Sequence, residues 1–232
     1  MKSKLLSNSP NRHREPEPCL RFTPTAWAKL LCLRDVTDAE VGGFGLSDAD
    51  DLLLVRDILL VRQEVSSVTV AFDDAAVADL FEDLVAAGCH PEQFARLWMH
   101  THPGSSPLPS STDENTFGRV FGECHWSVMF ILARTGQTYA RLRFGVGPGG
   151  DMEIPVEVDY SEPFAASDHL LWLEQYRQQV KVVESLSLPT LRNTYSWGEY
   201  EDMERWEKEM LLAEAAQGMD PGVQGPFGPF GR

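Results

Sequence analysis

Residues 99–113 read MHTHPGSSPLPSSTD, and the fold is expected to form around this stretch. The residues in front of it, 94–99, are apolar enough to form a buried strand. Alternate side chains of a strand share one face, so His100 and His102 point the same way at the end of this strand. The following loop, residues 103–109, holds three prolines and one glycine, which exclude a helix and predict a sharp excursion of the chain.

A helix is predicted to begin directly after this loop. Ser110 and Ser111 both supply hydroxyl groups suited to a helix cap, and Ser111 with Glu114 fits a capping box. Asp113 then lies in the first helical turn, where the loop can return it to the end of the strand. The spacing therefore predicts that a carboxylate and two imidazoles converge.

These three side chains predict a catalytic zinc site. Imidazole nitrogens and carboxylate oxygens both bind zinc, and three protein ligands with an open fourth position are typical of catalytic rather than structural sites. We predict that His100, His102 and Asp113 bind one Zn²⁺ ion. Other zinc signatures are missing: the sequence has no H-E-x-x-H, no Asp-His pair soon after H-x-H, and no P-C-x-x-C.

The spacing H-x-H-x7-S-x2-D, formed by His100, His102, Ser110 and Asp113, resembles the JAMM motif of the Jab/MPN-domain metalloproteases. That family also has a catalytic glutamate on an upstream strand beside the zinc. The segment 39–46, AEVGGFGL, is similar to the one that carries this glutamate, which makes Glu40 its counterpart. The resemblance covers residues from roughly 20 to 160 and combines a four-residue motif with a correctly placed Glu.

The resemblance implies an α/β (α+β) fold with a curved mixed β-sheet flanked by helices, similar to the cytidine-deaminase fold. A zinc ion in such a site activates a water molecule near neutral pH. Glu40 would accept the proton of this water and later deliver it to the departing amine, and Ser110 would donate a hydrogen bond to the developing oxyanion. Two alternatives stay open: Ser110 only caps the following helix, or Glu40 is a solvated loop carboxylate.

The activity implied is zinc-dependent hydrolysis of the peptide or isopeptide bond after the C-terminal tail of a ubiquitin-like protein, as in deubiquitinases. The expected partners are this ubiquitin-like protein or its conjugate, together with enzymes of the conjugation pathway. The glycines of residues 42–45 indicate a close approach of backbone or ligand, so the substrate tail is expected to run there; the alternative is a weak, bulged strand. Alternative functions are a non-catalytic Jab/MPN scaffold or binding subunit, and a peptidase for cell-wall or phage-tail-associated peptides.

Composition sets the remaining expectations. The chain has 232 residues, 43% of them hydrophobic, and a formal net charge of −15. This charge disfavours nucleic acid and fits either a partner with basic segments or simple solubility. The four cysteines show no metal-binding or disulfide pattern. Neither a signal peptide nor a membrane-length apolar run is evident, so a cytoplasmic protein without a membrane partner is expected; the oligomeric state is left open.

We divide the chain into an N-terminal arm (1–21), a Jab/MPN metalloprotease domain (22–160), a helical extension (161–217) and a disordered Gly/Pro-rich tail (218–232). Hydrophobic periodicity and capping signals predict four helices and six further strands around the site. The helices are expected at 23–34, 73–88, 165–187 and 197–217. The strands are expected at 40–46, 52–62, 65–72, 126–133, 138–146 and 152–160.

Overall fold

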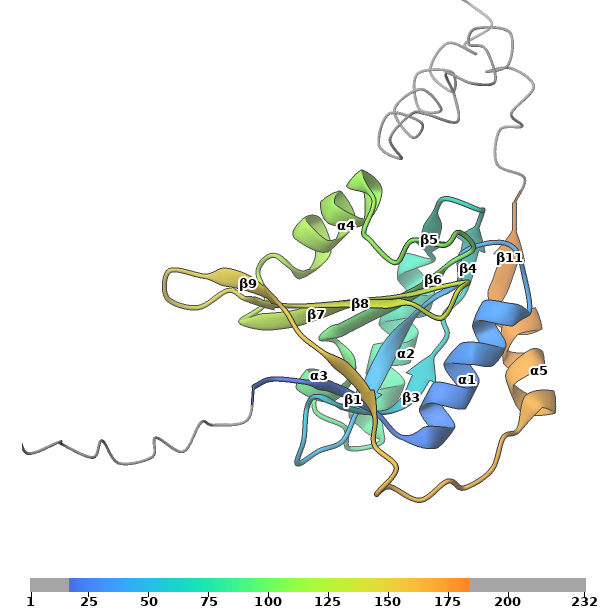
Figure 1. The fold of residues 1–232 in the computed structure, drawn as a ribbon, viewed down its shortest axis with the longest axis horizontal. Helices are drawn as coiled ribbons and strands as arrows, with labels where there is room; N and C mark the ends of the chain where they lie inside the picture. Colours follow the sequence, from blue (N-terminus) through green and yellow to red (C-terminus); the bar gives the residue numbers. More distant parts are fainter. Residues whose placement is uncertain (1–16, 184–232) are drawn as a thin grey trace, which may run out of the picture.

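The computed structural model describes residues 17–183, which form a mixed eight-stranded sheet with helices on both faces (Figure 1). The predicted helix at 197–217 and the Gly/Pro-rich tail lie outside the described residues. The strands of the sheet, in spatial order, are β10 (Val156–Val158), β1 (Leu20–Phe22), β3 (Leu54–Leu59), β2 (Gly42–Ser47), β6 (Leu97–His102), β7 (Trp126–Ala133), β8 (Thr138–Phe144) and β9 (Gly150–Glu153).

The sheet combines parallel and antiparallel pairs. Strand β1 runs parallel to β10 and β3, and β6 runs parallel to β7, whereas the other neighbours are antiparallel. The expectation of a curved mixed sheet flanked by helices is therefore confirmed at the level of α/β architecture.

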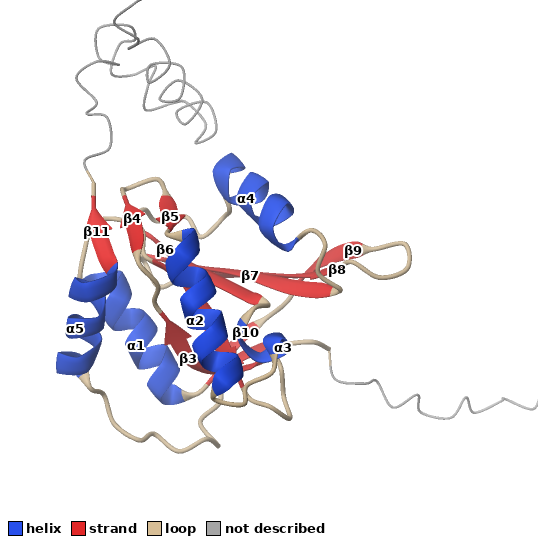
Figure 2. Cartoon of the chain, turned by 180° about the vertical axis from the view of Figure 1, so that it is seen from behind, coloured by secondary structure: helices blue, strands red, loops and turns tan. Residues whose placement is uncertain are grey.

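Each face of the sheet has its own hydrophobic core. Helices α1 (Pro24–Asp35) and α5 (His169–Gln179) cover one face, and Figures 1 and 2 show them side by side. Helices α2 (Asp74–Ala86) and α4 (Ser111–Phe121) cover the other face, where α3 (Pro91–Phe94) also packs near α2. Alternation along β6 explains the division, because Leu97 and Met99 belong to the first core and Trp98 to the second. The histidines follow Trp98 on the α4 face.

Two predicted helices begin and end where their capping residues indicate. Thr23 caps α1, since its hydroxyl accepts a hydrogen bond from the backbone N–H of Ala26, and Pro24 occupies the first turn. Asp73 caps α2 in the same way. Gly88 ends that segment with φ of +88°, a conformation that favours glycine. Both helix predictions are confirmed.

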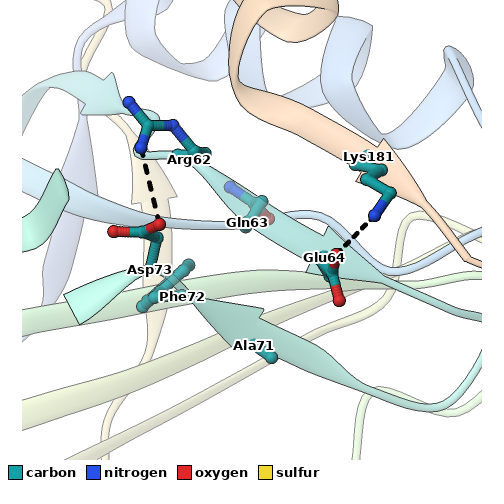
Figure 3. A pocket seen from close by; sticks show the side chains of 7 residues that line it. All are labelled: Arg62, Gln63, Glu64, Ala71, Phe72, Asp73 and Lys181. Atoms are coloured by element: carbon teal, nitrogen blue, oxygen red, sulfur yellow. Dashed lines mark hydrogen bonds and ion pairs between the residues drawn. The ribbon is translucent and has the colours of Figure 1, made fainter. Parts of the chain in front are cut away.

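The predicted continuous strand at 65–72 is wrong. The segment folds instead into a tight hairpin of β4 (Gln63–Val65) and β5 (Val70–Phe72), because Ser66 and Thr69 form a turn through a hydroxyl–hydroxyl contact of 2.8 Å and a backbone bond of 3.0 Å. Together with β11 (Val180–Val182) this hairpin forms a second sheet in the order β11-β4-β5. Figure 3 shows the ion pairs on this small sheet, Lys181 with Glu64 at 2.6 Å and Arg62 with Asp73 at 3.5 Å, beside a surface pocket.

Two further elements differ from their predictions. The expected strand 152–160 is divided at Pro155, which has no backbone N–H to give to a ladder. The first part, β9, pairs with β8, and the second, β10, lies at the opposite edge of the sheet. The helix expected at 165–187 covers only α5. After Gln179 the chain turns into β11, where valines favour a strand, and residues 184–187 lie outside the description.

The described part of the predicted helical extension packs on the domain. Trp172 of α5 is buried, Tyr176 packs against the α1 core, and β11 pairs in parallel with β4. At the other end, Leu20 and Arg21, which we placed in the arm, belong to β1 of the main sheet. Among residues 17–183 there is no helix with the length and apolar character needed to cross a bilayer.

Candidate metal centre

Strand β6 brings two imidazoles together at its carboxyl end. The side chains of His100 and His102 are each 1% exposed, and their Nε2 atoms lie 3.1 Å apart. The Nδ1 of His102 lies 3.1 Å from the carbonyl oxygen of Ser106, to which it donates as the protonated ring nitrogen. That bond directs the lone pair of Nε2 toward His100 and fixes the ring, as the outer hydrogen bonds of zinc-binding histidines do.

Asp113 reaches the histidines from the first turn of α4. Its Oδ1 lies 3.3 Å from Nε2 of His100, and its Oδ2 lies 3.5 Å from Nε2 of His102. The predicted convergence of the three side chains is confirmed, and Asp113 itself is only 6% exposed.

The expected capping box of Ser111 and Glu114 is wrong. The hydroxyl of Ser110 accepts a hydrogen bond from the backbone N–H of Asp113 at 3.1 Å, and the carboxylate of Asp113 accepts one from the N–H of Ser110 at 2.7 Å. The box is displaced by one residue, because the carboxylate turned toward the histidines is also the one that closes the helix start. Capping thus fixes the orientation of Asp113.

The distances among the three side chains are close to those found around a bound metal ion such as zinc. Ligand atoms about 2.0–2.2 Å from a tetrahedral zinc ion lie about 3.3–3.6 Å from one another. The three contacts among His100, His102 and Asp113 measure 3.1, 3.3 and 3.5 Å, and one donor atom from each residue lies within 4.8 Å of the others. Two nitrogens and one oxygen are also the donor set of many catalytic zinc sites. We conclude that these side chains can hold a metal ion.

The charge state of Asp113 also suits a ligand. Burial raises the pKa of this carboxyl, but its contacts with the imidazoles of His100 and His102 and the hydrogen bond from the Ser110 N–H outweigh the burial and hold the pKa well below its usual value. The carboxylate is therefore ionised at neutral pH, as metal binding requires.

Glu40 lies beside the same centre. Its carboxylate Oε1 is 3.7 Å from Nε2 of His102, and the side chain is 2% exposed. The backbone holds it firmly: the N–H of Glu40 donates to the carbonyl of Ser66 at 2.8 Å, and Val41 exchanges two hydrogen bonds with Thr101 of β6. The alternative of a solvated loop carboxylate is wrong, because Glu40 is buried at the entrance to β2.

Ser110 performs the capping role that we left open for it. Its hydroxyl, which is nearly buried, accepts the Asp113 N–H and retains its own proton for donation. The cap and an oxyanion contact are compatible, and the latter stays a prediction.

The expectation that a substrate tail runs along residues 42–45 is wrong. Strand β2 pairs with β3 on one side and β6 on the other, so it has no free edge. Its glycines permit close packing within the protein instead: a Cβ at Gly42 would lie 2.7 Å from the side chain of Val70, and one at Gly45 would lie 2.5 Å from that of Met99.

Gln63 is a site-supporting residue that the sequence did not reveal. Its buried amide accepts from the N–H of Gly42 and donates to the carbonyl of the same residue, both at 2.9 Å. The Gln63 side chain therefore makes the two hydrogen bonds to Gly42 that the backbone of a neighbouring strand would make. Gly42 lies two residues after Glu40. No local pattern distinguishes this glutamine from a surface one, because its partner is 21 positions away.

Arg141 anchors the helix that carries Asp113. Its guanidinium donates two hydrogen bonds to Glu114, at 2.9 and 2.7 Å, and lies 5.5 Å from the ring centre of Phe117. Arg143 also lies over Phe117, at 6.0 Å, without a bond to Glu114.

We expect Arg141→Gln to weaken zinc binding about tenfold, since outer partners of a metal site contribute on that scale. Arg143→Gln is the matched control and should bind zinc like the wild type. Titration against a chromophoric chelator measures both; equal affinities for Arg141→Gln and the wild type would contradict the anchoring role.

No family model matches the sequence, and no curated protein matches it. The geometry of the site is therefore the basis for assigning its chemistry.

Proposed function

We propose that this protein is a zinc-dependent hydrolase of the JAMM type that cleaves the peptide or isopeptide bond after the C-terminal tail of a ubiquitin-like protein. The observation that carries the proposal is the convergence of two buried imidazoles and one buried carboxylate, with a ligand atom of each within 4.8 Å of the others, and with the Glu40 carboxylate 3.7 Å from Nε2 of His102. The proposal includes the assignment of the mixed sheet to the Jab/MPN fold.

Each residue of the site has its own role in the proposed amide hydrolysis. His100, His102 and Asp113 would hold the zinc ion, which supplies Lewis acidity and an activated water. Glu40 accepts the proton of the attacking water and passes it to the departing amine, for which a fixed, buried carboxylate is suited.

The hydroxyl of Ser110 donates to the oxyanion as it forms. Its backbone is fixed by the capping box, so this donor needs little reorganisation during the reaction.

The substrate tail is proposed to add to β5 rather than to β2. Within residues 17–183, β5 is an edge strand of the small sheet, paired with β4 alone. Val70 of β5 lies against Gly42, next to the segment that carries Glu40. An extended tail can use the free main-chain groups of such an edge and so enter the site in strand conformation.

Purified protein loaded with zinc is expected to cleave fusions of ubiquitin-like proteins after their terminal Gly-Gly, and a chelator is expected to abolish this cleavage. Re-addition of zinc should restore it, which separates metal loss from unfolding. Mass spectrometry of the products locates the cut. Tight zinc binding without cleavage of any fusion or isopeptide-linked substrate would favour the scaffold alternative, and cleavage that survives complete zinc removal would contradict the mechanism.

A further inference from the structure

A hollow lies beside the loop that follows the histidines, on the β8 side of the candidate metal centre. It measures about 590 Å³ and is bounded by loop residues 105–108 and by strands β8 and β9. The loop is the one that follows the histidines, and it is fixed to the β7–β8 turn by a hydrogen bond from the Thr135 hydroxyl to the Ser105 carbonyl at 3.1 Å.

The register of the sheet places this hollow relative to the metal ligands. Tyr139, which lines it, pairs with Ile131 of β7, and Ile131 pairs with His100 of β6. Directly paired residues share a face, so the Tyr139 side chain lies on the same face as His100, two strands or about 10 Å away. On the loop side, the carbonyl of Ser106 holds the His102 ring. The hollow therefore continues the same surface from the site toward β9.

The walls of the hollow suit the side chain of a lysine or arginine. Leu108 is 60% exposed and offers an apolar wall, and the Tyr139 ring offers an aromatic one. Glu153 provides an exposed carboxylate, and within residues 17–183 it forms no ion pair. The neighbouring carboxylate of Asp151, by contrast, lies 3.9 Å from two guanidinium groups.

The charged groups around Tyr139 also favour a cationic side chain in the hollow. Burial raises the pKa of its phenol, Arg141 opposes that rise, and the carboxylates of Glu114, Glu153 and Asp151 add to it. Arg141 and Arg143 offset the carboxylates of Glu114 and Asp151, so Glu153 supplies the negative charge that favours a cation in the hollow.

We propose that this hollow is the leaving-group subsite and binds a cationic side chain, lysine or arginine, that follows the scissile bond of the substrate. The inference rests on the proposed function, because it places the acyl tail on the β5 side of the metal and the departing amine segment on the β8 side.

Binding tests the subsite without requiring turnover. The probe is N-acetyl-lysine methylamide, titrated into the zinc-loaded Glu40→Gln protein and followed by amide chemical shifts, with the norleucine analogue as the uncharged control. We expect saturable shifts at residues 137–139 with the lysine probe alone, and their loss in Glu153→Gln. Glu157→Gln, an exposed glutamate of β10 at the other edge of the sheet, should leave them unchanged. Equal shifts with both probes, or shifts confined to other regions, would overturn the subsite.

Turnover kinetics then test whether the hollow contributes to substrate specificity. Peptides ending their acyl half in Gly-Gly and continuing with lysine or norleucine should differ in KM and share kcat. We expect Glu153→Gln to raise KM for the lysine peptide about three- to fivefold, the scale of one exposed charge pair, and Glu153→Lys to reverse the preference. Lysine-selective binding in a protein that cleaves no substrate would disprove the hydrolase and, with it, the leaving-group role, and would leave only a cation-binding hollow; cleavage with no lysine preference would disprove the subsite alone.

Discussion

Glu40→Gln is expected to lower kcat by about 10²- to 10⁴-fold, the range that a positioned general base contributes. The amide keeps the shape of the carboxylate but cannot accept a proton from water. Glu40 lies 3.7 Å from the His102 nitrogen and is fixed by backbone bonds to Ser66 and, through Val41, to Thr101. The substitution should therefore change the proton transfer and leave the geometry unchanged.

Two further measurements make this test specific. Glu40→Gln should still bind zinc with near wild-type affinity, since three other residues provide the ligands. Glu64→Gln, an exposed glutamate of β4, is the control and should retain full activity. The kinetics are measured on a cleavable fusion at saturating substrate. A kcat within a few-fold of wild type would remove Glu40 from the mechanism, and loss of bound zinc would instead make it a fourth ligand.

The convergence of the three candidate metal ligands was predictable because the information for it is local. An apolar strand ending in H-x-H places both imidazoles on one face, and a loop rich in proline followed by a serine cap returns Asp113 to them. These signals depend on residues within one strand and one helix start. The capping box was displaced by one residue because Ser110 and Ser111 have the same chemistry, and only the position of the histidines decides which of them begins the helix.

The wrong predictions concern segments whose structure depends on residues far away in the sequence. The glycines of β2 suggested a channel, but Val70 and Met99 fill the space above them, and neither contact is visible in the local sequence. Residues 180–182 became a strand because β4 offers them an edge 117 positions earlier in the chain, where Lys181 meets Glu64. Local patterns carry little information on such pairings, because tertiary context decides which edge a short strand joins.

Asp113→Asn is expected to weaken zinc binding by more than about 100-fold, since even outer partners of a metal site contribute about 10- to 100-fold and Asp113 would contact the ion directly. The asparagine oxygen can still accept the Ser110 N–H, so the capping box and helix α4 should persist. The variant therefore separates ligation from folding. Asp73→Asn is the matched control: it changes the capping aspartate of α2, which accepts from Ala76 N–H outside the metal centre.

Thermal unfolding with and without zinc measures zinc binding by these variants without any substrate. Zinc bound to the folded state alone stabilises it by RT ln(1 + [Zn]/Kd), about 2.7 kcal/mol at a hundredfold excess over Kd. The wild type and Asp73→Asn should both show a rise in Tm that grows with zinc concentration, and Asp113→Asn should show none at the same concentrations. A zinc-dependent rise in Asp113→Asn equal to that of the wild type would show that the ion binds elsewhere, and both the metal centre and the hydrolase built on it would then be wrong.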